Sequence, residues 1–431
     1  MKLPTAPYKG ARDFYPEDKR RQDYMFGVLR RVVKSYGYEE YDAPILEALD
    51  LYKAKSGQEI VSEQTYSFVD RGGREVAIRP EMTPTVSRMV AAKRQELAYP
   101  LRWFSIPNLW RYERPQRGRL REHWQLNVDI FGVANTNAEL ELIFVADDIF
   151  QSFHATREMY QIKINHRQLT DYILSDYLQL THEQGYALIK LIDRKSKMEP
   201  FRFIEQLDAI LTPEQKQNSL SEKLLDVLDA KDIQGLPKEL LNCPPALELS
   251  AMIQSLVAHG LTNVIFDPTI IRGFDYYSGI VFEVFDTHPD NNRSMMGGGR
   301  YDGLVGMFGV DPVPTAGFGL GDATLANFIE LHNLMPTLTN DTKLYIAVLL
   351  NEIEGGLAIA RRFRQAGINC AIDVTGRKLG DQLKTAQKKQ INNVLIIGPD
   401  EIKANKYTLK NMDSSKEVKL TLDQVESKLA K

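Results

Sequence analysis

Cysteine is scarce in this chain: Cys243 and Cys370 are the only two among 431 residues, and they lie far apart without CxxC or CxxH spacing. That scarcity argues against a disulfide framework and against a structural zinc site, and it fits a reducing compartment. The chain also lacks any run close to the roughly 20 apolar residues that a membrane helix needs. Its first residues, MKLPTAPYKGARDFYPEDKRRQ, lack the apolar core of a secretory signal. We therefore expect a cytoplasmic protein with no membrane span.

A strong charge of one sign is absent too. The formal net charge is −3, with 26% charged and 43% hydrophobic residues, which is typical of a globular chain of two or three domains and excludes disordered and fibrous proteins. The charge is uneven, because residues 343–431 hold 16 Lys and Arg against 10 Asp and Glu, a net +6 that leaves −9 for the remainder. Such a segment could meet a polyanion, but a modest lysine excess is more often a solvated surface.

Several common catalytic signatures are missing. The sequence contains no GxxxxGK[ST] loop, no HExxH, no Ser-His-Asp set and no fixed-period repeat. P-loop NTPases, zincins, serine hydrolases, solenoids and propellers are therefore excluded. The segment GFGLGDATL holds alternating glycines, but it does not follow the first strand of a βαβ unit, so it does not predict a dinucleotide site. Function must come from other clustered motifs.

Hydrophobic spacing predicts a mixture of helices and antiparallel strands. Residues 18–37 repeat apolar side chains at helical spacing and end at Gly37, a residue that favours a helix C-terminus. The runs Tyr66–Val69 and Glu75–Ile78 flank the turn RGGR and predict a hairpin. Further helices are expected at 83–96 and about 137–160, and further strands at 101–111 and 161–167.

Residues 121–132 alternate large and polar side chains, which predicts one strand with two different faces. One face would carry Trp124, Leu126, Val128 and Ile130, and the other Gln125, Asn127 and Asp129. A polar strand face of this kind can line a pocket.

The later chain divides into three parts. A largely helical block at about 170–258 looks inserted into a sheet domain, because strands resume at NVIFD. The segment TPTLTNDT has linker composition, and we place the linker at 331–342. Residues 343–431 then alternate as βαβαβ, which predicts a small α/β domain with a mixed or parallel sheet.

The densest chemistry lies in RYERPQRGRLREHWQLNVDIFG, between two predicted strands. Arginine binds phosphate well because its planar fork donates paired hydrogen bonds and keeps its charge. Glu113 could accept from an exocyclic amine. The same loop could instead be a basic hairpin tip that serves solubility. The arginines are Arg111, Arg114, Arg117, Arg119 and Arg121.

Two further segments carry candidate ligand-binding groups. Glu81 and Thr83 follow a strand in IRPEMTPTVSR and could hold an ammonium group, or could equally cap a helix. Arg272, Tyr276 and Tyr277 lie in IIRGFDYYSGIVFEVFD, where the tyrosines could line a site or pack in a core. The nearby GGGRYDGL supplies glycines that permit close backbone approach to a ligand.

Together these segments resemble the histidyl-tRNA synthetases, a family of class II aminoacyl-tRNA synthetases, over nearly the whole chain. KGARDFYPED resembles the family's opening, YGYEEYDAPILE with Pro44 resembles motif 1, and WRYERPQRGRLREHWQLNVDIFG resembles motif 2. IIRGFDYYSGIVFE and GGGRYDGL are the most specific matches. The resemblance implies an α+β fold, with an antiparallel sheet flanked by helices at 1–330, a helical insertion at about 170–258 and an anticodon-binding α/β domain at 343–431. It also implies a homodimer formed through motif 1.

The implied activity is ATP-dependent formation of histidyl-adenylate and transfer to the 3′ end of tRNA(His), with Mg²⁺ bound alongside ATP. Each role below is implied by the resemblance. For histidine, Glu81 and Thr83 would bind the α-amino group, and Gln125 would bind the carboxylate side. Asp129 and Tyr277, with Tyr276 beside them, would bind the imidazole. For ATP, Arg111 and Arg272 would bind the α-phosphate as catalytic groups, Glu113 would bind adenine, and Arg119 would also contact ATP. Arg114 and Gln116 would contact the acceptor end of the tRNA.

The sequence departs from the family at motif 3. A glycine-rich strand followed by Glu-Arg is usual, whereas Ala323 and Thr324 stand here, so the arginine expected on the ATP γ-phosphate is missing. Another basic residue, such as Arg119 or Arg300, would then take the pyrophosphate. The alternative is a synthetase-like regulatory subunit of histidine biosynthesis, which binds histidine without charging tRNA and typically lacks the anticodon-binding domain.

Overall fold

The computed structural model describes residues 3–53, 64–195, 198–271, 276–291, 293–349 and 352–429. The chain forms two units, Met1–Met335 and Pro336–Lys431, and the described residues of each contain hydrophobic clusters of their own. Leu334 and Met335 still pack against the core of the first unit, just ahead of the boundary. In the described part of the chain, no helix combines the length and the apolar character needed to cross a membrane.

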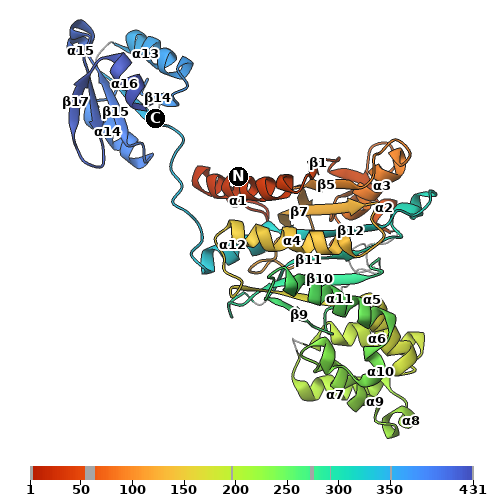
Figure 1. The fold of residues 1–431 in the computed structure, drawn as a ribbon. Coiled ribbons are helices and arrows are strands. Elements are labelled where there is room, and N and C mark those ends of the chain that lie inside the picture. The colour runs from red at the N-terminus through yellow and green to blue at the C-terminus, as the bar shows by residue number, and fades with distance from the viewer. Residues whose placement is uncertain are drawn as a thin grey trace. The chain divides into compact units, whose positions relative to one another are not determined.

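The first unit is built on a nine-stranded sheet in which the order is β1-β5-β7-β12-β11-β10-β8-β9, with β6 paired to β7 off this path (Figure 1). Neighbours from β5 to β8 run antiparallel, whereas β1 runs parallel to β5 and β9 parallel to β8. The strands are β1 (Glu39–Glu40), β5 (Leu101–Ser105), β6 (Asn108–Trp110), β7 (Glu122–Phe131), β8 (Tyr160–His166), β9 (Val264–Phe266), β10 (Ile280–Asp286), β11 (Ser294–Arg300) and β12 (Thr315–Gly321).

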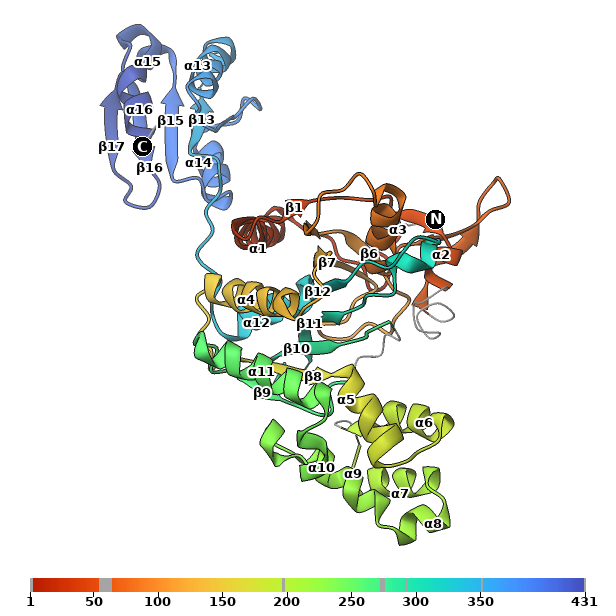
Figure 2. The ribbon, with the colours of Figure 1, turned by 45° about the vertical axis from the view of Figure 1, so that its right-hand side comes forward.

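Three amphipathic helices cover one face of this sheet: α1 (Pro16–Ser35), α4 (Asn137–Ser152) and α12 (Asp322–Leu331) (Figures 1 and 2). Their apolar side chains form one core with Leu126 and Val128 of β7. The predicted helix at 18–37 is confirmed, and Gly37 follows it at a φ of +81°. The helix expected at about 137–160 ends at Ser152, so its predicted end was wrong. His154 adopts a left-handed φ of +65° there, which stops helical hydrogen bonding.

A small three-stranded sheet lies near the start of the chain, in the order β2-β4-β3. Its β3–β4 hairpin, closed by the RGGR turn, confirms the predicted antiparallel pair. Its elements, with the helices beside it, are β2 (Leu46–Ala48), β3 (Ser67–Val69), β4 (Glu75–Ile78), α2 (Asp50–Lys53) and α3 (Thr83–Lys93).

The segment between β8 and β9 is helical, as its composition predicts. Its leucines and isoleucines extend the core of the first unit, because α5 and α11 contact β8. Thr181 and Thr212 begin two of these helices with capping boxes, in which the threonine and a glutamine three residues later satisfy both backbone N–H groups. The helices are α5 (Arg167–Tyr172), α6 (His182–Ile192), α7 (Pro200–Ile210), α8 (Pro213–Gln217), α9 (Leu220–Leu228), α10 (Lys238–Leu241) and α11 (Pro244–Ala258).

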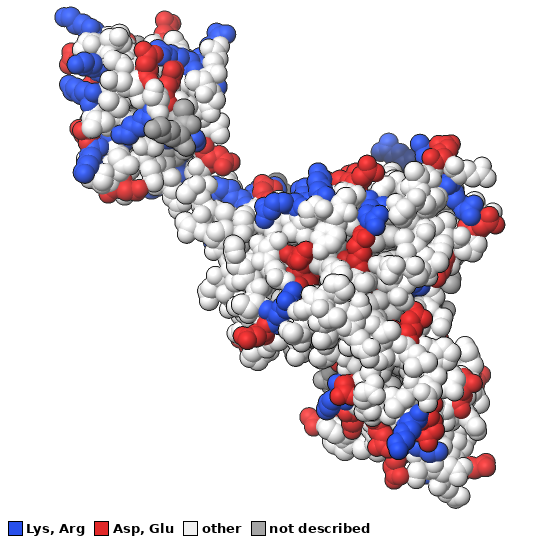
Figure 3. All heavy atoms as spheres, viewed as in Figure 1, with Lys and Arg blue, Asp and Glu red and all other residues white. Residues whose placement is uncertain are grey.

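The second unit is a five-stranded mixed sheet in the order β14-β13-β15-β16-β17, with helices packed against it. Strands β14, β13 and β15 run parallel to one another, β16 runs antiparallel to β15, and β17 runs antiparallel to β16. Lys and Arg side chains are numerous on the face of this unit seen in Figure 3. Its elements are β13 (Leu344–Val348), α13 (Ile353–Gln365), β14 (Cys370–Ile372), α14 (Leu379–Lys388), β15 (Asn393–Ile397), α15 (Pro399–Ala404), β16 (Tyr407–Asn411), β17 (Glu417–Leu420) and α16 (Leu422–Leu429).

Candidate active site

The centre of the large sheet is hollow on the face opposite the helices, because glycines replace side chains there. In the register of β11, β12 and β7, Gly297 pairs with Gly319, which pairs with Asn127, while Gly317 pairs with Asp129. Directly paired residues project on the same face of a sheet. The glycines thus leave space above their backbone into which the polar side chains of β7 extend.

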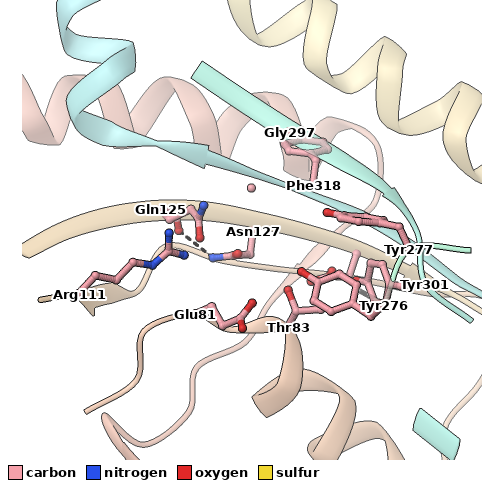
Figure 4. A pocket seen from close by; sticks show the side chains of 13 residues that line it. Glu81, Thr83, Arg111, Gln125, Asn127, Tyr276, Tyr277, Gly297, Tyr301 and Phe318 are labelled. Carbon is pink, nitrogen blue, oxygen red and sulfur yellow. Dashed lines mark hydrogen bonds between the residues drawn. The ribbon is translucent and has the colours of Figure 1, made fainter. Parts of the chain in front are cut away.

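The polar face of β7 lies in this hollow, as the alternation at 121–132 predicts. The cavity encloses about 490 Å³, including its open mouth. Figure 4 shows Arg111 at one end, three tyrosines at the other, and Gln125 and Asn127 between them. The residues that line the cavity are Glu81, Thr83, Arg111, Gln125, Asn127, Asp129, Tyr276, Tyr277, Gly297, Tyr301, Gly317, Phe318 and Gly319.

Asp129 is the buried charge at the tyrosine end, with 3% of its surface exposed. Burial raises the pKa of this carboxyl to about 7, although the hydroxyl of Tyr301 donates a hydrogen bond to Oδ1 and partly offsets the effect. Oδ2 accepts no hydrogen bond from a described residue. A buried oxygen left in this state costs free energy until a donor arrives. Asp129 therefore offers one acceptor to a ligand with an N–H or O–H group.

The tyrosines form the wall around this carboxylate. Tyr276, Tyr277 and Tyr301 are all buried, and their ring centroids lie 4.8–6.3 Å apart. They also pack in a small apolar cluster with Val281 of β10. Tyr276 and Tyr277 therefore both line the cavity and pack in a core cluster, and their contact with a ligand stays a prediction.

Glu81 and Thr83 enter the cavity from the start of α3. Met82 occupies the N-cap position, and no side chain caps this helix, so the interpretation of the pair as a helix cap is wrong. Glu81 is 3% exposed, and it faces the cavity on the side away from Gln125 (Figure 4). Both side chains carry oxygen atoms that can accept hydrogen bonds from a cation.

Arg111 lies at the end of the cavity opposite the tyrosines, and the backbone of Pro80 holds its side chain. Its Nε donates to the carbonyl oxygen of Pro80 at 2.9 Å, which leaves the terminal nitrogens directed toward the cavity (Figure 4). His123 lies two residues before Gln125 on β7. Its burial and the nearby charges of Arg111 and Arg12 lower its pKa to about 3, so this imidazole is neutral at physiological pH.

The arginine-rich loop folds back as a tight turn. Gln116 and Arg119 exchange both backbone hydrogen bonds at 2.9 Å, which places Gly118 in the turn at a φ of +72°. Arg119 pairs with Glu113 at 2.5 Å between Nε and Oε2. Glu113 is 9% exposed, whereas Arg114 and Gln116 are exposed.

Arg300 is not part of this cavity, and the hypothesis that it binds pyrophosphate is wrong. Its guanidinium pairs with Glu139 of α4 at 2.6 Å, and the two side chains are 8% and 1% exposed. Further hydrogen bonds go to the carbonyl oxygens of Val133 and Asn135. Because its donors are used inside the protein, Arg300 stabilises the packing of β11 on α4.

Arg272 lies outside the described residues. Alternation placed Asn127 on the polar face of β7, but the sequence assigned it no role of its own. Tyr301 and Phe318 line the cavity although the sequence did not point to either. Tyr301 could not have been predicted, because its contact with Asp129 depends on the pairing of β11, β12 and β7.

Comparison with known proteins agrees with this architecture. The histidyl-tRNA synthetase family model matches residues 10–325, and the anticodon-binding domain model matches residues 344–431. The chain is 45% identical to a histidine–tRNA ligase of Leptospira biflexa, over 100% of this chain and 98% of that protein. It is 34% identical to a histidine–tRNA ligase of Thermoplasma volcanium, over 96% of each.

A solved structure shows the same fold. The histidyl-tRNA synthetase from Nostoc sp. PCC 7120 superposes with a TM-score of 0.79 at 24% identity, over 100% of this chain and 99% of that one. The predicted family and fold class are thereby confirmed: the chain belongs to the histidyl-tRNA synthetase family.

Proposed function

We propose that this protein activates L-histidine with ATP and transfers the histidyl group to the 3′ end of tRNA(His). One observation carries the proposal. A single cavity joins the buried carboxylate of Asp129, with its open acceptor, to the guanidinium of Arg111. An amino acid with a polar ring would reach the first, while its carboxylate and an attached phosphate would reach the second.

At the tyrosine end, we propose that the imidazole donates to Asp129 Oδ2 and meets Tyr277 on its other side, with Tyr276 closing the wall. Glu81 and Thr83 would accept from the α-ammonium, and Gln125 would donate to the carboxylate side. Buried polar groups of this kind reject amino acids that cannot pair with them, because the groups would stay unsatisfied.

At the arginine end, the proposed first step needs no side-chain nucleophile. A carboxylate oxygen of histidine attacks the α-phosphorus of ATP, the bond to the β-phosphate oxygen breaks, and pyrophosphate leaves. Arg111 would stabilise the negative charge that develops on the α-phosphate. Arg272, proposed on the same phosphate, rests on the RGFDYY resemblance alone. Glu113 would accept from the adenine amine, and Arg119 would contribute charge near the phosphates.

In the second step a ribose hydroxyl of the tRNA 3′ end attacks the acyl carbon, and AMP leaves. Arg114 and Gln116 are exposed on the arginine-rich loop, where a polynucleotide end can reach them. We propose residues 343–431, with their net charge of +6, as the anticodon-binding part beyond the linker. We propose a cytoplasmic location, because translation takes place in that compartment.

Mg²⁺ is proposed as a companion of ATP. The described residues hold no group of three or more potential metal ligands, which fits an ion carried mainly by phosphate oxygens rather than by a protein cage. When bound, it would neutralise charge on the leaving pyrophosphate. The regulatory-subunit alternative is not favoured, because the anticodon-binding domain is matched at 344–431.

The test of this function is histidine-dependent exchange between ATP and labelled pyrophosphate, run with purified protein, Mg²⁺ and a panel of amino acids. Exchange with histidine alone, followed by charging of tRNA(His), is the expected result. A protein that binds histidine but shows no exchange would instead be the regulatory subunit.

Arg111→Ala is expected to lower kcat/KM for the exchange by roughly 10²- to 10³-fold, because one preorganised donor to the developing charge is lost. Histidine affinity, measured by calorimetry, should change little, since Arg111 lies at the opposite end of the cavity from Tyr301, whose hydroxyl donates to Asp129. Arg361→Ala, an exposed arginine on α13, is the control and should match the wild type. Equal loss of histidine binding and exchange would show that Arg111 serves the fold of the site.

We also propose a homodimer formed through the small sheet. Four large apolar side chains on β2, β3 and the residue before β2 are 45–64% exposed: Ile45, Leu46, Phe68 and Val69. Large apolar side chains that stay exposed on one small sheet favour a protein interface there, and the first two residues belong to the segment that resembles motif 1.

Replacing Phe68 and Val69 with aspartate is expected to weaken the dimer at least about 100-fold, because two charges would be buried without partners. Sedimentation velocity would then report a monomer at micromolar concentration. Leu247→Asp, equally exposed on α11, should stay dimeric. A dimer that survives the double substitution would place the interface elsewhere.

A further inference from the structure

The first turn of α12 carries threonine at position 324, where the resemblance to the family predicts an arginine on the ATP γ-phosphate. Thr324 is buried, and its hydroxyl donates to the carbonyl oxygens of Gly321 at 3.1 Å and Met295 at 3.3 Å. Its side chain is therefore committed to the junction between α12 and β11. A polyphosphate at this end needs a positive charge from another element.

Three elements meet at this junction: the turn of the arginine-rich loop, the start of β11 and the first turns of α12. A Cβ built on Gly118 would lie 3.4 Å from Thr324 Cγ2, 3.4 Å from Asn327 Nδ2 and 3.8 Å from Arg293 Cδ. Arg293 directly precedes β11, and its Cδ approaches the same side of Gly118 as the Thr324 methyl group. The two side chains therefore approach the turn of the arginine-rich loop from different elements.

The carboxylates of this region already have partners. Asp322 pairs with Arg12 at 2.7 Å, and Glu113 pairs with Arg119 at 2.5 Å. Arg293 makes no ion pair within the described part of the chain. Of the guanidinium groups of Arg12, Arg119 and Arg293, only that of Arg293 has no carboxylate partner among the described residues, so its charge is open to an anion.

We propose that Arg293 supplies the guanidinium that holds the β- and γ-phosphates of ATP, and the pyrophosphate product, in place of a side chain at position 324. The inference rests on the proposed ATP-dependent activation and identifies the residue that completes it. A planar fork suits this task because it donates two parallel hydrogen bonds to phosphate oxygens. The N-terminal end of α12 adds partial positive charge from its backbone.

The test compares ATP with AMP as ligands, measured by calorimetry with the full-length protein and Mg²⁺. Arg293→Ala is expected to weaken ATP binding about 10- to 100-fold, since charge-assisted bonds to the outer phosphates are lost. AMP, which lacks those phosphates, should bind as to the wild type. Arg293→Lys should fall between the two, because it keeps the charge but not the fork.

Relocation of the charge gives the sharper result. The double variant Arg293→Ala with Thr324→Arg should recover most of the ATP affinity, and Arg202→Ala, an exposed arginine on α7, should behave as the wild type. The proposal is wrong if Arg293→Ala binds ATP normally, if it loses AMP to the same degree, or if the double variant binds no better than the single one. Circular dichroism and thermal unfolding on each sample verify the fold.

Histidine-dependent exchange on the same samples separates this inference from the function on which it rests. Exchange in the wild type together with normal ATP binding in Arg293→Ala would overturn only the role of Arg293. No exchange in the wild type would overturn the synthetase function itself.

Discussion

Asp129→Asn is expected to lower kcat/KM for histidine in the exchange reaction by roughly 10³-fold while ATP affinity stays within about twofold. The substituted amide would still accept from Tyr301 through Oδ1, so the local packing is kept. Its NH₂ group would, however, replace the open acceptor Oδ2, and a donor would then face the imidazole N–H. Exchange kinetics at varied histidine, with ATP saturating, measure the effect.

The same variant carries a pH signature. Burial raises the pKa of Asp129 to about 7, so in the free protein this carboxyl gains a proton as the pH falls below neutrality. The profile of kcat/KM reports free-enzyme groups, and it should therefore fall below pH 7 in the wild type. The imidazole of the histidine substrate also titrates, near pH 6.5, and this affects the wild type and the variant alike. Only the additional fall in the wild type belongs to Asp129, and Asp129→Asn should lack it.

Stability should move in the opposite direction from activity. Because the folded-state pKa of Asp129 lies above its unfolded value, the folded state binds more protons between about pH 4 and pH 7, and stability falls as the pH rises through that window. Asp129→Asn removes this penalty and should unfold at a higher temperature than the wild type at pH 8, with the difference shrinking toward pH 4. Asp311→Asn, at a carboxylate 84% exposed, is the control.

Either of two results would contradict this account of Asp129. One is an unchanged histidine KM in Asp129→Asn, which would mean that the ring binds elsewhere. The other is a variant less stable than the wild type at pH 8, which would mean that the carboxylate is paired and ionised in the folded protein.

Gly317→Ala is the second substitution with a large expected effect. A Cβ at this position would overlap Asp129 Oδ1 and lie 2.7 Å from the Tyr301 hydroxyl and 2.8 Å from the Val128 carbonyl oxygen. Two of these atoms belong to the histidine end of the cavity and the third to the backbone of β7, so the strand cannot yield without breaking its register. We expect about 1–3 kcal/mol of destabilisation and loss of measurable histidine binding.

Chemical denaturation and calorimetry with histidine test both parts of that prediction. Gly303→Ala is a matched control, because a Cβ there has no atom within 4 Å and the residue follows the glycine-rich strand β11 next to β12. It should keep histidine binding. If Gly317→Ala bound histidine normally, the hollow above β12 would not be needed for the ligand.

Much of the site could be predicted from local pattern. Alternation along residues 121–132 was enough to place Gln125, Asn127 and Asp129 on one face, because side chains in any strand point alternately to its two sides. The dense arginines around Gly118 favoured a phosphate-binding loop over a basic hairpin tip, since arginine combines permanent charge with a paired donor geometry, and that binding stays a prediction. Both inferences need only neighbours in sequence.

Arg300 shows where local pattern failed. It lies in a glycine-rich segment beside the cavity, and its charge suggested a phosphate ligand, yet it pairs with Glu139 on the covered side of the sheet. Whether an arginine faces a ligand or a buried carboxylate depends on which helix packs over its strand. The packing of α4 against the sheet is not encoded in the residues around position 300.

Sequence by itself determined the family, the order of elements and the polar face of β7, because these follow from periodicity and from motifs that are continuous in the chain. Tertiary structure alone decided that Tyr301 meets Asp129, that Gly317 and Gly319 leave room above the sheet, and that Arg293 and Thr324 both approach Gly118. Each of these depends on strand register or helix packing between residues far apart in sequence. Such long-range pairings are settled only when the whole core closes.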